Sequence, residues 1–228
     1  MMIRESYPLE VMLRSLAEIA DADWYRYAFS RDPINRKFND AQRRIWMEKS
    51  ITCGREYAEQ IRKEYGCNDP KAMAEAMKMK VFYPELPKNA DRVLFAEYRA
   101  PDRIYIYMDA VNRAGKYLQR PEIKEILAGK TDVSSVLLAH ELFHNVEEKY
   151  KKEIYTRTEK IQLWSLGVIH YTSPIIALSE IAAMAFAKEL TGISYSPYIM
   201  DVLLMYDYSS EDACGLYEEI LGYRDLHQ

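Results

Sequence analysis

Cysteine is scarce in this chain of 228 residues, where it occurs only as Cys53, Cys67 and Cys214. The number is odd and no pair has the spacing of a metal-binding motif, which argues against both a disulfide framework and a zinc ribbon. We therefore expect a reducing, cytoplasmic environment. The chain also lacks a glycine-rich phosphate-binding loop and a serine or cysteine nucleophile elbow, so two common catalytic designs are absent.

Long apolar runs and an excess of positive charge are missing as well. No stretch of about 18 apolar residues exists, so no membrane span is expected, and the N-terminal segment lacks the apolar centre of a signal peptide. The 31 basic and 35 acidic residues give a net charge of −4, which argues against a surface that mainly binds nucleic acid. Apolar residues make up 49% of the chain, enough to bury a sizeable core.

Hydrophobic spacing predicts a mostly helical α+β protein with one small sheet. We expect a single domain with three parts, which are a helical lead segment (1–70), a core (80–192) and C-terminal helices (193–228). Strands rich in β-branched and aromatic residues are expected over 81–83, 92–98 and 103–108. Helices are expected over 7–30, 40–65 with Asp40 as cap, 70–79, 109–118, 121–128, 133–147, 174–191, 197–206 and 210–221.

The sequence HELFH, from His140 to His144, matches the HExxH pattern. Histidines at this spacing on a helix lie on the same face, so both can bind one Zn²⁺ at about 2.0–2.1 Å. Glu141 would sit beside the metal and could act as the general base toward a metal-bound water. Thr131 and Asp132 are candidate N-caps of the helix that carries the motif. The motif therefore predicts a catalytic zinc site that still needs a third protein ligand.

Glu180 is the candidate third ligand. It is the ionisable residue inside the apolar stretch that follows Ser173 and Pro174, which together predict a helix start. A buried carboxylate without a partner is costly, and metal binding would remove that cost and complete a His₂Glu site with an open fourth position. Pairing with an arginine or lysine is the alternative. Glu147 competes for the same role, but at about 1.5 Å per residue it lies about 10 Å along the helix from His140.

At this point the chain resembles the gluzincin zinc metallopeptidases, and within them it is most similar to the ImmA/IrrE-like family. The likeness rests on RIYIYM before the motif helix, on LLAHELFH, and on EIAAMAFAKEL, which starts at Glu180. These stretches fall within residues 80–192. The resemblance implies a zincin-like fold, in which a three-stranded sheet packs on the HExxH helix. It also implies zinc endopeptidase activity, and some members of the family cut repressors.

The predicted reaction is hydrolysis of peptide bonds by a metal-bound water. The expected zinc ligands are His140, His144 and Glu180. The expected general base is Glu141. RIYIYM is expected to hold an extended substrate by strand addition, and His170 and Tyr171 are candidate donors to the oxyanion. The expected partner is a peptide or protein substrate, with a regulatory protein among the candidates, and neither nucleic acid nor a membrane is expected.

Two other functions are compatible with the same motif. The cluster could hold a metal in a non-catalytic interaction module, which a fourth protein ligand or a core plugged by Phe143 would favour. A zinc hydrolase acting on a small amide is the second alternative, which a closed pocket in place of a long cleft along RIYIYM would favour. DNA binding is the weakest option, because no helix gathers lysine and arginine strongly on one face.

Overall fold

The computed structural model of the chain describes residues 7–85, 94–128, 132–167 and 169–225. Its α-helices are α1 (Leu9–Ala17), α2 (Tyr25–Ser30), α3 (Asp40–Tyr65), α4 (Pro70–Ala76), α5 (Met108–Tyr117), α6 (Pro121–Ile126), α7 (Val133–Lys149), α8 (Tyr155–Thr158), α9 (Ile176–Thr191), α10 (Ile199–Tyr206) and α11 (Ser210–Asp225). Its strands are β1 (Lys80–Phe82), β2 (Ala96–Arg99), β3 (Arg103–Ile106), β4 (Lys160–Leu166) and β5 (Ile169–Pro174). Helices around one small sheet confirm the predicted α+β class.

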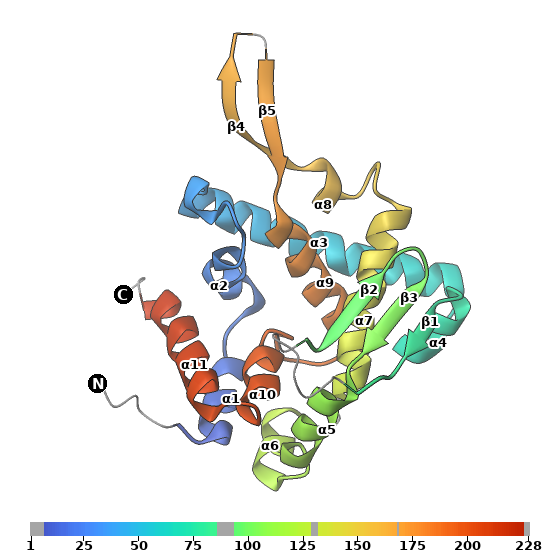
Figure 1. Ribbon diagram of the computed structural model, residues 1–228, viewed down its shortest axis with the longest axis vertical. Coiled ribbons are helices and arrows are strands. Elements are labelled where there is room, and N and C mark those ends of the chain that lie inside the picture. The colour runs from blue at the N-terminus through green and yellow to red at the C-terminus, as the bar shows by residue number, and fades with distance from the viewer. Residues whose placement is uncertain (1–6, 86–93, 129–131, 168, 226–228) are drawn as a thin grey trace.

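Helix α9 lies at the centre of the molecule, between α3 and α7 (Figure 1). It is apolar nearly all round because its faces belong to two different cores. Leu178 and Ile181 pack in a core with α1, α2, α10 and α11, whereas Phe186 packs in a second core with α7 and the sheet. At Gly54 of α3 an added Cβ would lie 2.2 Å from the Ala182 carbonyl oxygen of α9. The glycine therefore allows α3 and α9 to approach closely.

The sheet has the strand order β1-β3-β2, with β1 parallel and β2 antiparallel to β3. Ile104 and Ile106 of β3 are buried in the core that also contains Leu138 and Leu142 of α7, so the sheet packs on the HExxH helix as predicted. Both edges of β3 are paired, however. The prediction that RIYIYM holds a substrate by strand addition is therefore wrong. Among the described residues, no strand pairs with the outer edge of β2.

Several predicted element boundaries shift for identifiable reasons. The expected helix over 7–30 is divided into α1, a 3₁₀ turn (Asp21–Trp24) and α2. Asn39 caps α3 in place of Asp40, because its side chain accepts from the Gln42 amide while the Gln42 side chain bonds back to the Asn39 amide. Asp132 caps α7 as predicted, through the amides of the next two serines. The other candidate cap, Thr131, and the first residues of the predicted strand 92–98 lie outside the described residues.

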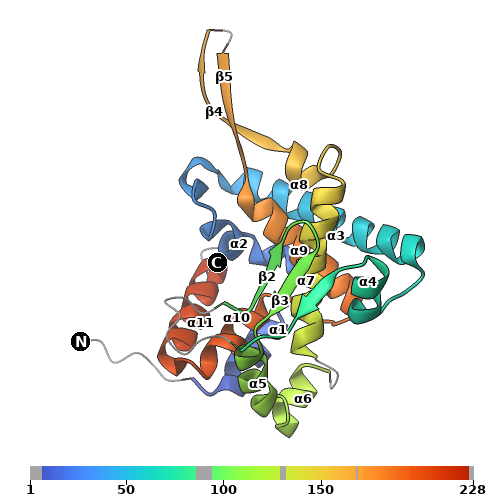
Figure 2. The same cartoon turned by 45° about the vertical axis from the view of Figure 1, so that its right-hand side comes forward.

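The hairpin formed by β4 and β5 was not predicted. It projects away from the helices and the sheet (Figures 1 and 2). The rings of Trp164 and Tyr171 stack at 5.5 Å on this hairpin, and both side chains are exposed. Because Ser173 and Pro174 belong to β5, α9 begins at Ile176 and the predicted cap at Ser173 is wrong.

The three cysteines and the helices agree with what the composition predicts. Cys53, Cys67 and Cys214 are all free thiols, and Cys53 and Cys214 are buried. Within the described ranges no helix combines the length and apolar character that a membrane crossing requires.

Candidate metal centre

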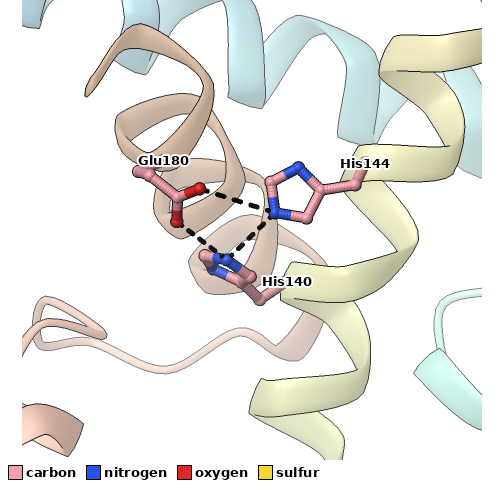
Figure 3. A group of neighbouring side chains, drawn as sticks. All are labelled: His140, His144 and Glu180. Carbon is pink, nitrogen blue, oxygen red and sulfur yellow. Dashed lines mark hydrogen bonds and ion pairs between the residues drawn. The ribbon is translucent and has the colours of Figure 1, made fainter. Parts of the chain in front are cut away.

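The HExxH motif lies in the middle of α7, with both histidines on the side that faces α9. Figure 3 shows the two imidazoles one turn apart, with their Nε2 atoms directed toward each other. These two nitrogens are 3.3 Å apart. The Asp132 cap fixes the start of the helix, and the buried Leu138 and Leu142 on the opposite side anchor it on the sheet. Helix geometry therefore brings both potential ligands to one point, as the spacing predicts.

Glu180 of α9 completes a triad with the two histidines (Figure 3). Its Oε2 lies 3.3 Å from His140 Nε2, and its Oε1 lies 3.8 Å from His144 Nε2. Ligands at about 2.0–2.1 Å in tetrahedral geometry are separated by about 3.3–3.4 Å. Two of the three separations match this value, and the third, to the other carboxylate oxygen, is longer at 3.8 Å, so the triad could hold a small metal ion between its donor atoms. Within the described part of the chain, this is the group of His, Cys, Asp and Glu side chains that could hold a metal ion.

The electrostatics of the triad follow from the close approach of His140 and Glu180. Burial lowers the pKa of His140, but the hydrogen bond and negative charge of Glu180 outweigh it and raise that pKa to about 9. Partial loss of hydration beside the histidines raises the pKa of Glu180, but the hydrogen bond and positive charge of His140 lower it to about 2. Without a cation the pair is thus oppositely charged, and binding of a cation would displace the His140 proton.

Glu180 is less buried than the apolar stretch around it predicts. Its side chain is 48% exposed. It faces a cavity of about 330 Å³ between α7, α9, α10 and the residues that lead into β2. The carboxylate is therefore accessible from the cavity, as an open coordination position requires.

Glu141 lines the same cavity but is not a member of the triad. Its side chain is 8% exposed, and burial raises its pKa above the usual range for glutamate. The backbone N–H of Tyr98 in β2 donates a hydrogen bond to its carboxylate. This contact ties the carboxylate to the strand at the cavity edge and holds it beside the two histidines.

Glu147, the competing third ligand, is fully buried on the far side of His144. Its Oε2 is 3.9 Å from His144 Nδ1, the nitrogen that faces away from Glu180. The carboxylate accepts hydrogen bonds from Thr156 Oγ1 at 2.5 Å and Ser179 Oγ at 2.9 Å, and Arg157 Nη2 lies 3.0 Å away. Glu147 therefore orients the ligand rather than binding beside it, and sequence reasoning did not identify its three partners.

The cavity is mostly apolar apart from the metal triad, Glu141 and one further carboxylate, that of Asp201. Sequence reasoning did not identify Asp201, although it is the acidic residue in the apolar stretch IMDVLLMY of α10. The same pattern led to Glu180. By contrast, His170 and Tyr171 lie on β5 in the projecting hairpin, and neither side chain lines the cavity.

Phe143 does not obstruct the site. Its side chain is fully buried and packs against Phe186 of α9, with ring centroids 5.6 Å apart. It is not among the residues that line the cavity. The bulky residue within the motif therefore contributes to the core between α7 and α9.

We compared the chain with known protein families, curated proteins and solved structures. No protein-family model matches the chain, and searches of curated proteins and solved structures also find no match. The arrangement of His140, His144 and Glu180 is consistent with an HExxH…E motif. The interpretation of the site therefore depends on the geometry of the chain itself.

Proposed function

We propose that the protein is a zinc-dependent metallopeptidase of the gluzincin type, similar to the ImmA/IrrE-like family. The observation that carries the proposal is the triad His140, His144 and Glu180, whose donor atoms are spaced for one tetrahedral cation. Glu141 stands beside it without being a member. Three protein ligands and an accessible fourth position are typical of catalytic zinc, whereas structural sites are closed by a fourth ligand.

The residues of the cavity support hydrolysis in the following way. A cation held by the triad would supply Lewis-acid chemistry, polarising the scissile carbonyl and lowering the pKa of water. Glu141 accepts a proton from the attacking water and passes it to the nitrogen of the leaving amine. Glu147 holds His144 in orientation from the opposite side. The peptide bond and one water thus become a carboxylate and an amine.

The free edge of β2 is suited to hold an extended substrate. The Phe95 carbonyl oxygen accepts a hydrogen bond from the Tyr107 amide. The backbone groups of Phe95 therefore point toward the β3 side of β2. The backbone N–H and C=O groups of successive residues in an antiparallel strand point alternately toward and away from the paired strand. Those of Ala96 and Tyr98 therefore point away from β3. The Tyr98 amide bonds to Glu141, and Ala96 lines the cavity. A peptide that adds to this edge would therefore pass directly over Glu141 and the triad.

The alternatives make different demands on the site. A non-catalytic metal module is disfavoured, because the described residues provide three ligands to the cluster and Phe143 packs in the core. Hydrolysis of a small amide has one observation in its favour, since about 330 Å³ is within the range of small-molecule pockets, about 300–1,000 Å³. The unpaired outer edge of β2 favours a peptide substrate over a small amide, because an extended chain can pair with it.

The experiment compares purified, zinc-loaded protein with a Glu141→Gln variant on a library of blocked peptides, with cleavage read by mass spectrometry. We expect the variant to keep one zinc per chain and to lose about 10²–10⁴-fold in rate, which is the typical contribution of a general base. Glu148→Gln is the matched control, because Glu148 is the exposed neighbour of Glu147 and pairs only with Lys151 among the described residues. Full activity of Glu141→Gln, or zinc retained by His140→Ala, would refute the proposal. Cleavage of small amides alone would favour the second candidate.

A further inference from the structure

Asp201 is a carboxylate in the cavity that the proposed reaction does not use. It lies in the first turn of α10, where Met200, Asp201 and Leu204 form one helix face that lines the cavity opposite the metal triad. The side chain accepts a hydrogen bond of 2.6 Å from the Tyr27 hydroxyl. That contact fixes its position, but it supplies no positive charge.

The charges around Asp201 leave it without a cationic partner. No ion pair to Asp201 occurs among the described residues. Arg31 and His140 both lower its pKa from a distance, but the Arg31 guanidinium pairs with Glu219 at 3.0 Å, and His140 Nε2 lies 3.3 Å from Glu180 Oε2 as part of the metal triad. Burial raises the pKa of Asp201, which is the expected penalty for a carboxylate removed from water.

A cation in the triad does not remove this imbalance. The charge of a divalent ion is balanced by the carboxylates of Glu180, which would bind it, and Glu141, which stands beside it. The carboxylate of Asp201 is then one negative charge in excess, in a cavity whose wall is mostly apolar. An unpaired charge in such surroundings is costly, so the cavity favours a ligand that brings a positive charge.

The shape of the lining indicates what kind of cation fits. Apart from the charged groups the cavity wall is apolar, and Met200 and Leu204 of α10 form this wall on either side of Asp201. Lysine and arginine combine a long apolar stem with a cationic end, so the stem can contact such a wall while the end reaches a carboxylate. A small hydrated cation would leave the apolar wall without a partner.

We propose that Asp201 determines the specificity of the cavity by binding the cationic end of a lysine or arginine side chain next to the bond that is cut. This inference rests on the proposed peptidase function. The substrate class is a peptide or protein segment that places a basic residue beside the scissile bond. Tyr27 acts as a positioning residue, because its hydroxyl holds the carboxylate toward the cavity.

The test uses blocked peptides that differ at one position, where lysine is compared with norleucine and arginine with citrulline. Each pair keeps the length of the side chain and removes its charge. In the zinc-loaded protein we expect the lysine and arginine peptides to have the higher kcat/KM. Because a charge-assisted bond is lost, Asp201→Asn should lower kcat/KM for the lysine and arginine peptides about 10- to 100-fold, mainly through KM. The kcat/KM of the norleucine peptide should stay unchanged. Asp212→Asn, an exposed acid at the start of α11, is the matched control.

Two further measurements separate this inference from the proposed function. Zinc-loaded wild-type protein is immobilised, and the peptides that it retains from a library with reduced, uncleavable amide bonds are identified. Enrichment of basic peptides that disappears in Asp201→Asn supports the inference even if the wild type cuts nothing. Tyr27→Phe should reduce the basic preference while the zinc content stays constant. Equal cleavage of lysine and norleucine peptides, or no enrichment of basic peptides on the column, overturns the role of Asp201. Equal cleavage would leave the peptidase function intact.

Discussion

Replacing Glu147 tests whether the metal ligand is held in place from behind. The carboxylate is fully buried and accepts hydrogen bonds from Thr156 and Ser179, with Arg157 at 3.0 Å. Ser179 Oγ is also 3.4 Å from His144 Nδ1. Carboxylates and hydroxyls at the far nitrogen of a ligating histidine fix its tautomer and ring orientation. Glu147→Ala should therefore weaken both the fold and metal binding.

The expected size of the effect can be worked out from these contacts. Each hydroxyl left without its acceptor costs about 1–3 kcal/mol, so Thr156 and Ser179 together cost about 2–6 kcal/mol of unfolding free energy. Arg157 is half exposed and can be solvated by water, so it adds little. At about 2–4 °C per kcal/mol for a chain of this size, the melting temperature should fall by about 4–24 °C. Zinc affinity should fall by about 10–100-fold, as for other outer partners of ligating histidines.

The assay combines calorimetric melting of the metal-free protein with zinc titration against a competing chelator. Glu147→Gln, which keeps the volume and one acceptor oxygen, should show smaller losses in both measurements. Glu148→Ala is the control, since its side chain is exposed and bonds to Lys151 alone among the described residues. Unchanged melting of Glu147→Ala would refute the energetic argument. A lower melting temperature with unchanged zinc affinity would refute the orienting role toward His144.

Three further predictions concern the fold and the metal. Gly54→Ala should cost about 1–3 kcal/mol in urea unfolding, because the new Cβ meets the Ala182 oxygen at 2.2 Å. Zinc at 100 times its Kd should stabilise the protein by about 2.7 kcal/mol, about 5–11 °C in the melting temperature, and this shift should vanish in His140→Ala. Arg113 and Tyr117 lower the pKa of Asp207, so the ionised carboxylate stabilises the fold above its unfolded pKa of about 3.9. The melting temperature of Arg113→Met should therefore approach that of the wild type as pH falls below this value.

The parts of the fold that sequence predicts are those with a local signal. Helix α7 was predicted from its apolar stripe and from Asp132, whose side chain bonds to amides two and three residues away. The spacing of His140 and His144 defined their common face for the same reason, since one helical turn separates them. Such features depend on residues that are close in the chain, so the sequence contains all that is needed to infer them.

The features that sequence reasoning missed depend on contacts between distant residues. The position of β3 at the centre of the sheet follows from pairing with β1 and β2, which local composition does not specify. The β4–β5 hairpin projects from the body, and none of its described side chains is buried, so no buried face indicates it in the sequence. The partners of Glu147 come from α8 and α9, and only the tertiary fold brings Thr156 and Ser179 to the same carboxylate.

Glu180 and Asp201 show where the argument from buried charge holds and where it needs correction. Each is an acid in an apolar stretch, but we applied the argument that such an acid needs a partner to Glu180 alone. Both border one cavity, so access from the cavity explains why the chain tolerates them. For Glu180 the partner is the pair of histidines and the cation that fits between them. For Asp201 the described residues supply a hydrogen bond from the Tyr27 hydroxyl and no ion pair. If the proposed peptidase function holds, the basic side chain of a substrate is the cation that our proposal places beside Asp201.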